Sequence, residues 1–334
     1  MSPIKISVVI ASRNRVHLLS SCLEAFSRQD FNKDLFEIIV INDGSSDGTE
    51  AFLSQFKAAT NLNFQFISHE NKGVSYSRNV GIGLANGRYI AFTDDDCIVP
   101  HDWLSRIAAL WEAMGPSIAA IGGPLDSQPG NSIISRYIHF LDEFNYIPVL
   151  GKYWITHKHV SMLPANAPIA YARTSNAVFR AQCIKDAGGF NVTFKKPGGE
   201  DPELCYRILS LGFHFYFDKE LVVLHRTRDN IRSFFGSLRN YIEGEFRIQS
   251  TIEAYASTNI RSNYFLIPCR KISSLFLSVL TAPFTVMRLL HSSQYSFLEA
   301  FFFPFVTISS KIYALCLAFY YQSRYALRKC PHSD

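Results

Sequence analysis

Short apolar runs alternate with segments of helical spacing along the first hundred residues. The runs are rich in β-branched residues and lie at 6–10, 36–41, 64–67 and 89–92. Between them, apolar residues recur every three or four positions, as in 16–26, 51–56 and 75–84. These two periods predict strands and amphipathic helices, respectively. Strands that alternate with helices of this length form βαβ units, so we predict an α/β fold with a mostly parallel sheet.

The pattern continues less regularly after residue 100. It predicts helices over 101–113 and 202–211, strands at 118–121 and 221–224, and a return to regular structure at 172–180. Residues 125–172 are aromatic and proline-containing, and they give no assignment.

Polar clusters follow three of the predicted strands, at 12–15, 42–45 and 94–96. Open α/β sheets bind ligands outside the carboxyl ends of their strands. We therefore expect the three clusters at one edge of the sheet, where they suit a nucleotide site.

The most acidic of these clusters consists of Asp94, Asp95 and Asp96. Three carboxylates at a strand end repel one another unless a cation neutralises them. Divalent Mg²⁺ and Mn²⁺ favour such oxygens and commonly bridge to phosphates. In an extended chain Asp94 and Asp96 share a face, whereas Asp95 points the other way and is expected to matter least. The alternative interpretation is a helix N-terminus or a solvated turn.

Two later features carry candidate chemistry. Glu200 and Asp201 follow a Pro-Gly-Gly turn, and His225 comes at the end of a predicted strand. A carboxylate that faces the donor is a candidate general base, although an acidic helix cap has the same pattern. The histidine is a candidate metal ligand, although a buried core histidine is the commoner use of such a position.

The charge is unevenly distributed along the 334 residues. Residues 236–334 hold ten of the 33 basic and five of the 28 acidic residues, so they carry the whole formal net charge of +5. The neutral first 235 residues do not suit nucleic-acid binding, which needs a basic patch. The basic, aromatic remainder suits contact with anionic lipid.

The seven cysteines are scattered, and none forms a Cys-x-x-Cys pair. This pattern favours reduced thiols in a cytosolic compartment over a disulfide framework or a zinc knuckle. No basic and apolar leader precedes the first predicted strand, so we expect no secretory signal.

Two long apolar segments, 264–290 and 295–321, contain scattered charges. The longest stretch without a charge, 272–287, has 16 residues, whereas a spanning helix needs roughly 20. The composition suits helices that lie in the membrane interface, or short kinked spans whose charges reach the surface. A buried helical hairpin or an oligomer contact is the alternative.

The order of these motifs resembles the family 2 glycosyltransferases, which have the GT-A type of fold. The resemblance covers about two thirds of the chain, 4–230. Its segments are 8–15 (VVIASRNR), 41–49 (INDGSSDGT), 71–81 (NKGVSYSRNVG), the acidic triplet, 173–180 (RTSNAVFR), 188–190 (GGF) and 199–201 (GED). It implies a mixed, mostly parallel sheet flanked by helices. We expect a catalytic domain over 1–235 and a helical, membrane-associating region over 236–334.

The resemblance also implies where the nucleotide-sugar donor binds. Asp43 would accept a hydrogen bond from the nucleobase, with Ala11 and Arg13 beside it. Arg78 would sit near the nucleotide, and Asp94 would face the ribose or diphosphate.

Further roles follow from the later motifs. Asp96 would ligate the divalent metal, Mn²⁺ or Mg²⁺, and His225 would complete its shell. Asp201 matches the catalytic base, and the adjacent Glu200 is a second candidate catalytic carboxylate. Asn176 would line the donor-sugar and acceptor cleft. Asp95 is placed with the donor-binding residues.

The resemblance therefore implies a metal-dependent, inverting glycosyltransferase. The expected donor is a nucleotide-diphosphate sugar, with UDP as the expected nucleotide, and the acceptor is a hydroxyl of a glycan or a polyprenyl-linked sugar. The Gln-x-x-Arg-Trp element of processive synthases is missing, which favours non-processive transfer. Lipid contact through 264–321 implies the cytoplasmic face of the membrane.

Ala11 stands where the family usually has proline, and Asn42 where an aspartate is common, so both leave the choice of nucleobase open. Two other enzyme classes are disfavoured because the first predicted strand is not followed by a glycine-rich loop. These are the sugar nucleotidyltransferases and the Rossmann dehydrogenases. The alternative non-enzymatic interpretation is an inactive scaffold protein at the membrane.

Overall fold

The computed structural model describes residues 5–128, 130–144, 172–227, 229–255, 266–292 and 295–329. These residues form two compact units. The first contains 1–129, 139–196 and 200–227, and the second contains 130–138, 197–199 and 228–334. The predicted boundary at 235/236 stays a prediction, although these units divide the chain earlier, before helix α8.

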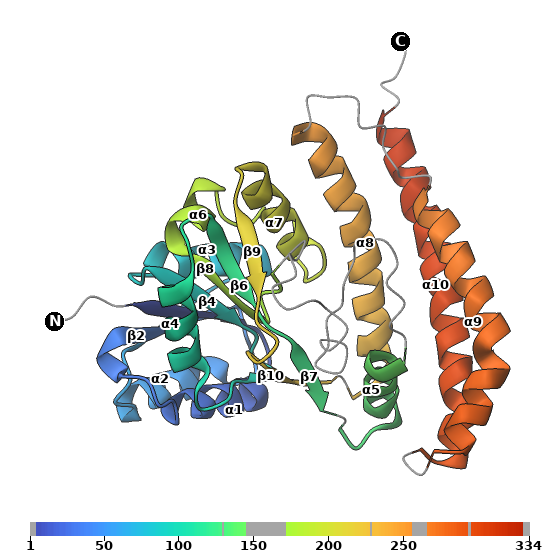
Figure 1. The fold of residues 1–334 in the computed structure, drawn as a ribbon, viewed down its shortest axis with the longest axis horizontal. Coiled ribbons are helices and arrows are strands. Elements are labelled where there is room, and N and C mark those ends of the chain that lie inside the picture. Colours follow the sequence, from blue (N-terminus) through green and yellow to red (C-terminus); the bar gives the residue numbers. More distant parts are fainter. Residues whose placement is uncertain are drawn as a thin grey trace. The chain divides into compact units, whose positions relative to one another are not determined.

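A seven-stranded sheet forms the centre of the first unit, in the order β3-β2-β1-β4-β8-β6-β9 (Figure 1). Strand β8 runs antiparallel to its neighbours β4 and β6, and the other pairs are parallel. The mixed, mostly parallel sheet is thus as predicted. The strand bounds are β1 Ile6–Ser12, β2 Phe36–Asp43, β3 Phe64–His69, β4 Tyr89–Thr93, β6 Ile118–Gly122, β8 Asn176–Arg180 and β9 His214–Phe217.

Helices cover both faces of this sheet because its central strands are apolar on both sides. On β1, Val8 contributes to the core beneath one face and Val9 to the core beneath the other. The first core includes residues of α1 (Val16–Ser27), α2 (Thr49–Ala59) and α4 (Trp103–Ala113). The second includes residues of α3 (Val74–Leu84), α6 (Ala181–Asp186) and α7 (Glu200–Ser210). A short 3-10 helix, η1 (Lys33–Leu35), precedes β2.

A second, three-stranded sheet has the order β5-β10-β7. It is formed by β5 (Cys97–Ile98), β7 (Leu125–Gln128) and β10 (Val223–Arg226), and His225 pairs with Cys97 across it. This small sheet therefore brings the histidine next to the acidic triplet, which comes just before β5. Of the stretch left unassigned from sequence, β7 and α5 (Ile133–Phe144) are described, and 145–171 lies outside the described residues.

The second unit is helical. It contains α8 (Ile231–Tyr255), α9 (Leu266–Leu290), α10 (Phe297–Lys329) and the first half of α5. Within it, α10 packs against both α8 and α9. By length and composition, the segments Lys271–Leu290 and Phe297–Arg324 are long and apolar enough to cross a membrane. The predicted C-terminal hydrophobic helices are therefore present.

Candidate active site

The acidic triplet lies where the end of β4 meets the start of β8. Thr93, the last residue of β4, pairs with Asn176, the first residue of the antiparallel β8. This pairing places Thr174 and Ser175 beside the carboxylates that follow β4. The Ser175 hydroxyl donates to Asp94, and its carbonyl accepts from Thr93.

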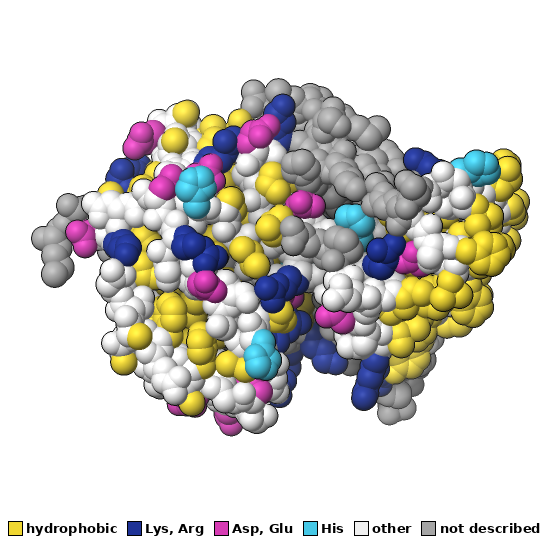
Figure 2. Space-filling view, turned by 90° about the horizontal axis from the view of Figure 1, so that it is seen from below, with side chains coloured by type: hydrophobic (Ala, Val, Ile, Leu, Met, Phe, Trp, Pro, Cys, Tyr) yellow, Lys and Arg dark blue, Asp and Glu magenta, His cyan; other side chains and the backbone are white. Residues whose placement is uncertain are grey.

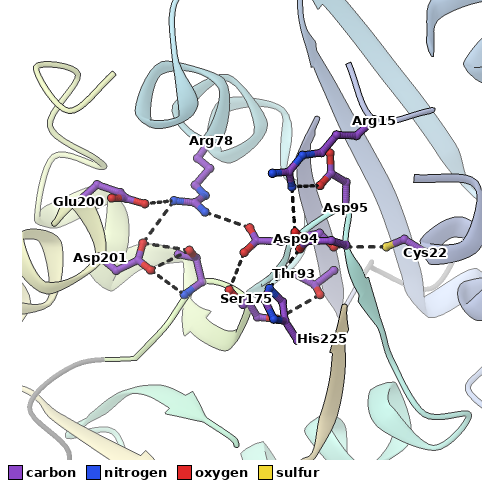
Figure 3. Close-up of polar contacts among 12 residues, drawn as sticks. Arg15, Cys22, Arg78, Thr93, Asp94, Asp95, Ser175, Glu200, Asp201 and His225 are labelled. Carbon is purple, nitrogen blue, oxygen red and sulfur yellow. Dashed lines mark hydrogen bonds and ion pairs between the residues drawn. The ribbon is translucent and has the colours of Figure 1, made fainter. Parts of the chain in front are cut away.

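Arg78 joins three carboxylates from distant parts of the chain (Figure 3). Its guanidinium lies 3.1 Å from an oxygen of Asp94, 2.9 Å from Glu200 and 3.3 Å from Asp201. The Arg78 side chain is only 5% exposed, which makes these ion pairs largely shielded from solvent. Arg78 thus ties the triplet to the Gly-Gly-Glu-Asp motif, and its predicted contact with the nucleotide stays a prediction.

Asp201 is held by Thr174 as well as by Arg78. The Thr174 hydroxyl donates to both carboxylate oxygens at 2.9 Å, and the Thr174 backbone N–H donates to one of them at 3.1 Å. Burial and the neighbouring Glu200 raise the pKa of Asp201 to about 7. A carboxylate with this pKa is suited to accept a proton near neutral pH. Glu200 is more buried than Asp201, with a side chain 4% exposed against 13%.

Asp95 points away from these groups and into the protein. It accepts hydrogen bonds from Ser12 at 2.7 Å and from Arg15 at 2.9 Å. Burial raises the pKa of Asp95 to about 6, against the attraction of Arg15. Residues 95 and 96 form a turn, closed by the hydrogen bond from the Cys97 N–H to the Asp94 carbonyl, so the inward direction of Asp95 comes from this turn and not from the alternation expected of an extended chain.

Asp96 and His225 lie close enough to share a cation. The His225 Nε2 is 3.4 Å from an Asp96 oxygen, and the ligand atoms of Asp96, Cys97 and His225 all lie within 4.8 Å of one another. A divalent ion therefore fits between the carboxylate and the imidazole. Mg²⁺ and Mn²⁺ prefer oxygen and nitrogen to sulfur, so we assign no ligand role to the fully buried Cys97.

Electrostatics also favour a cation at this place. Five carboxylates are gathered around two guanidinium groups: Arg15 pairs with Asp95 and Asp96, and Arg78 pairs with Asp94, Glu200 and Asp201. Among the side chains joined by these ion pairs, acidic groups therefore outnumber guanidinium groups, an excess of negative charge when they are ionised. Such an excess in a partly buried site favours a bound divalent ion.

Asp43 lies at the end of β2 and is 6% exposed. It accepts hydrogen bonds from the backbone N–H groups of Lys72, at 2.7 Å, and Gly73. In the amide orientation that satisfies both neighbours, Asn71 donates to Asp43 and accepts from Arg13. Arg13 is exposed and Ala11 half-buried. Asp43 and Arg13 are thus linked through one amide, and their predicted common role at the nucleobase stays a prediction.

Gly73 can occupy its position only because it has no side chain. Its φ is +95°, and a Cβ there would lie 2.4 Å from the carbonyl oxygen of Lys195. Any other residue would displace this backbone and withdraw the N–H group that binds Asp43.

Asn176 has a different place from the one predicted. Its side chain is fully buried, accepts from the indole N–H of Trp103 and donates to the carbonyls of Pro124 and Leu221. The structure therefore gives Asn176 an internal role that joins β8 to neighbouring segments, in place of the predicted role at the donor sugar.

Replacing this amide is expected to affect stability rather than binding. Asn176→Ala would leave three buried hydrogen-bonding groups without their partner, so we expect the free energy of unfolding to fall by about 1–3 kcal/mol or more. Chemical denaturation measures this loss, and titration with UDP should give an unchanged affinity. A large loss of nucleotide affinity in a normally stable variant would instead restore the predicted role at the donor.

Three side chains of this site were not predicted from sequence. Thr174 and Ser175 reach the site through the antiparallel pairing of β8, which no local pattern reveals. Arg15 was noted only as part of a polar cluster after the first strand, and it contacts both Asp95 and Asp96.

Comparison with known proteins identifies the family. The model of "Glycosyl transferase family 2" matches residues 7–180. Glycosyltransferase AglE of Haloferax volcanii is 27% identical over 245 residues, which are 73% of this chain and 71% of that protein. The chain spans only 39% to 64% of the next three curated relatives.

Solved structures agree in fold. The mannosyltransferase PcManGT from Pyrobaculum calidifontis, in complex with GDP-Man and Mn²⁺, has a TM-score of 0.60 at 15% identity and covers 96% of this chain and 88% of its own. S. aureus TarS 1–349, in complex with UDP-GlcNAc, has a TM-score of 0.54 at 15% identity, with coverages of 99% and 94%. The GT-A fold predicted from the motifs is therefore confirmed, and the chain is an enzyme that belongs to glycosyl transferase family 2.

Proposed function

We propose that this glycosyltransferase catalyses metal-dependent, inverting transfer from a UDP-sugar to a hydroxyl group of a glycan or polyprenyl-linked acceptor, without processive extension. The observation that carries the proposal is the joining of Asp94 and Asp201 through Arg78, with Asp96 and His225 beside them. This constellation offers a carboxylate base and a cation site within one cluster. The TarS complex with UDP-GlcNAc and the PcManGT complex with GDP-Man and Mn²⁺ support a nucleotide-sugar donor and a divalent metal.

In the proposed reaction, Asp201 removes the proton of the acceptor hydroxyl as its oxygen attacks the anomeric carbon. The bond between that carbon and the diphosphate oxygen breaks in the same step, so the configuration inverts. Arg78 and Thr174 hold the Asp201 carboxylate in place, and Asp94 faces the ribose or diphosphate. A Mn²⁺ or Mg²⁺ ion held by Asp96 and His225 would supply positive charge to the departing diphosphate.

The pH dependence of transfer should report on Asp201. Because burial raises its pKa to about 7, the base is protonated at acid pH, and kcat/KM should rise with pH and level off above about 7. Thr174→Val removes the hydroxyl proton that is shared between both oxygens of the ionised carboxylate, so the rising limb should move to higher pH, and Thr174→Ser should restore it. Initial rates at saturating metal measure this shift. A pH-independent rate between about 5 and 8 would contradict the assignment of the base.

A donor screen tests the function directly. The full chain is incubated with UDP-, GDP- and dTDP-sugars and Mn²⁺, with and without polyprenyl-linked acceptors, and release of the nucleoside diphosphate is measured. We expect acceptor-dependent release of UDP, with inverted anomeric configuration in the product. Release of pyrophosphate from a nucleoside triphosphate and a sugar phosphate would identify a nucleotidyltransferase instead. Donor binding without turnover on any acceptor would favour the inactive scaffold.

A further inference from the structure

The second unit exposes an apolar surface that a water-soluble protein rarely keeps. Of the 19 exposed large hydrophobic residues among those described, 15 lie on α9 and α10 or directly beside them, so exposure is concentrated on this pair. Of the apolar segment Lys271–Leu290 in α9, only 6% is buried, whereas 39% of the apolar segment Phe297–Arg324 in α10 is buried. Soluble monomers rarely expose a continuous apolar patch of more than a few hundred Å². Figure 2 shows hydrophobic side chains gathered over the surface of the α9–α10 pair.

The exposed residues of α10 occupy one face of that helix. Phe297, Phe301 and Phe305 are four residues apart, and Ile312 and Phe319 continue the same stripe. We call the surface formed by these residues and by Ile272, Phe276, Val279, Leu280, Phe284 and Met287 of α9 the apolar face. The opposite side of α10 is buried, and Ala314, Ala318 and Tyr321 pack there against Ile242 and Phe246 of α8.

Polar groups lie on the buried side of α10 along its whole length. Glu299 near its start pairs with Arg136, Thr307 contacts Tyr137, and Tyr321 near its end donates to Glu243 of α8. Residues 299 and 321 are about 33 Å apart at the rise of an α-helix, which matches the roughly 30 Å of a bilayer's hydrocarbon core. A crossing α10 would therefore place Glu299 and Tyr321 at opposite membrane interfaces, with only the Thr307–Tyr137 contact in the hydrocarbon region, so these groups by themselves do not decide against spanning.

Helix α8 gives the reason against spanning. It packs along α10 from the Phe235–Tyr313 ring contact to the Phe246–Tyr321 contact. Between these two points α8 carries Arg239, Glu243 and Glu245, and Arg239 is exposed. If α10 crossed a bilayer, these charges would enter the hydrocarbon, where each charged side chain is costly.

We propose that α9 and α10 lie flat in one leaflet of an anionic membrane, with the apolar face toward the acyl chains and α8 toward water. The exposed Arg288 and His291 at the end of α9, and Arg324 near the end of α10, would meet the anionic headgroups. In this arrangement the apolar face contacts acyl chains while the charged residues of α8 stay in water. A spanning hairpin would place those charges in the hydrocarbon. The proposal concerns the second unit alone and does not depend on the proposed sugar transfer.

Vesicle binding tests which surface meets lipid, using a matched pair of variants. Ile272 on α9 and Ile231 on α8 are 47% and 48% exposed, so a glutamate at either position starts from the same solvent environment. We expect the full chain to float with phosphatidylcholine–phosphatidylglycerol vesicles, and Ile272→Glu to weaken this binding about tenfold. Phe276→Glu and Phe284→Glu should weaken it at least as much, whereas Ile231→Glu should leave it unchanged. Circular dichroism and UDP binding confirm that each variant is folded.

A labelling experiment distinguishes a flat hairpin from a spanning one. His291 lies between the two helices, so His291→Cys in a chain without other reactive thiols marks the turn of the hairpin. When the protein is bound to sealed vesicles, a membrane-impermeant maleimide added outside should label this thiol. Protection until detergent is added would overturn the flat arrangement.

Two other outcomes would overturn the proposal. The first is that the full chain has no affinity for the vesicles, and the second is that Ile231→Glu weakens binding as much as Ile272→Glu does. A stable dimer that becomes monomeric in Phe276→Glu, without vesicle binding by the parent chain, would show instead that a second copy covers the apolar face.

Discussion

Asp201→Asn should reduce the rate of sugar transfer about 10²–10⁴-fold, because the amide cannot accept the proton of the acceptor hydroxyl. The substitution keeps the size of the side chain and leaves Asp94, Asp96 and His225 in place. Affinity for the donor nucleotide should therefore stay measurable. Initial rates of acceptor-dependent UDP release and a calorimetric titration with UDP check the two parts of this expectation.

Glu200→Gln is the matched control, because Glu200 is the adjacent carboxylate and also pairs with Arg78. We expect it to lose less activity than Asp201→Asn, since Glu200 is nearly inaccessible and Asp201 is held by Thr174 at the site. Near-normal turnover in Asp201→Asn would remove Asp201 as the base. If only Glu200→Gln were inactive, the catalytic base would be Glu200.

Asp96→Ala should abolish most of the metal dependence of nucleotide binding and lower turnover about a hundredfold or more. The carboxylate of Asp96 is one of two groups that we expect to hold the divalent ion, and His225 is the other. UDP titrations with and without Mn²⁺ measure the metal-dependent part of the affinity.

The triplet supplies its own control for this experiment. Asp95 is directed inward to Ser12 and Arg15, so Asp95→Asn should reduce stability but keep the response to Mn²⁺. An unchanged response to Mn²⁺ in Asp96→Ala would exclude Asp96 as a ligand. If Asp95→Asn alone lost the response to Mn²⁺, the metal ligand would be Asp95 instead of Asp96.

Local pattern predicted the first half of the fold well because its strands are sequential and parallel. The strands at β1, β2, β3 and β4 and the helices between them lie within a few residues of the predicted segments. Beyond residue 120 the chain uses short strands, an antiparallel insertion and a second sheet. The strands that were not predicted are β7 and β9, which have four residues each, and the two-residue β5 at 97–98, and such short strands show little periodicity.

The sequence by itself determined the family, the order of the motifs and the identity of the carboxylates, because these depend on residue types that stay together along the chain. The extended-chain alternation predicted for the triplet did not decide its geometry, because residues 95 and 96 form a turn. The triplet alone was equally compatible with a helix start, and its place between Asp43 and Asp201 in the motif order favoured a metal site.

Only the tertiary structure decided which of these groups meet. The antiparallel pairing of β8 with β4 brought Thr174 and Ser175 to the carboxylates, and it turned Asn176 into the protein interior. Arg78 became the link between two carboxylate motifs more than a hundred residues apart. The packing of α8 on α10 likewise left a single apolar face on the second unit. Such contacts depend on strand direction and helix packing, which side-chain periodicity along one segment does not encode.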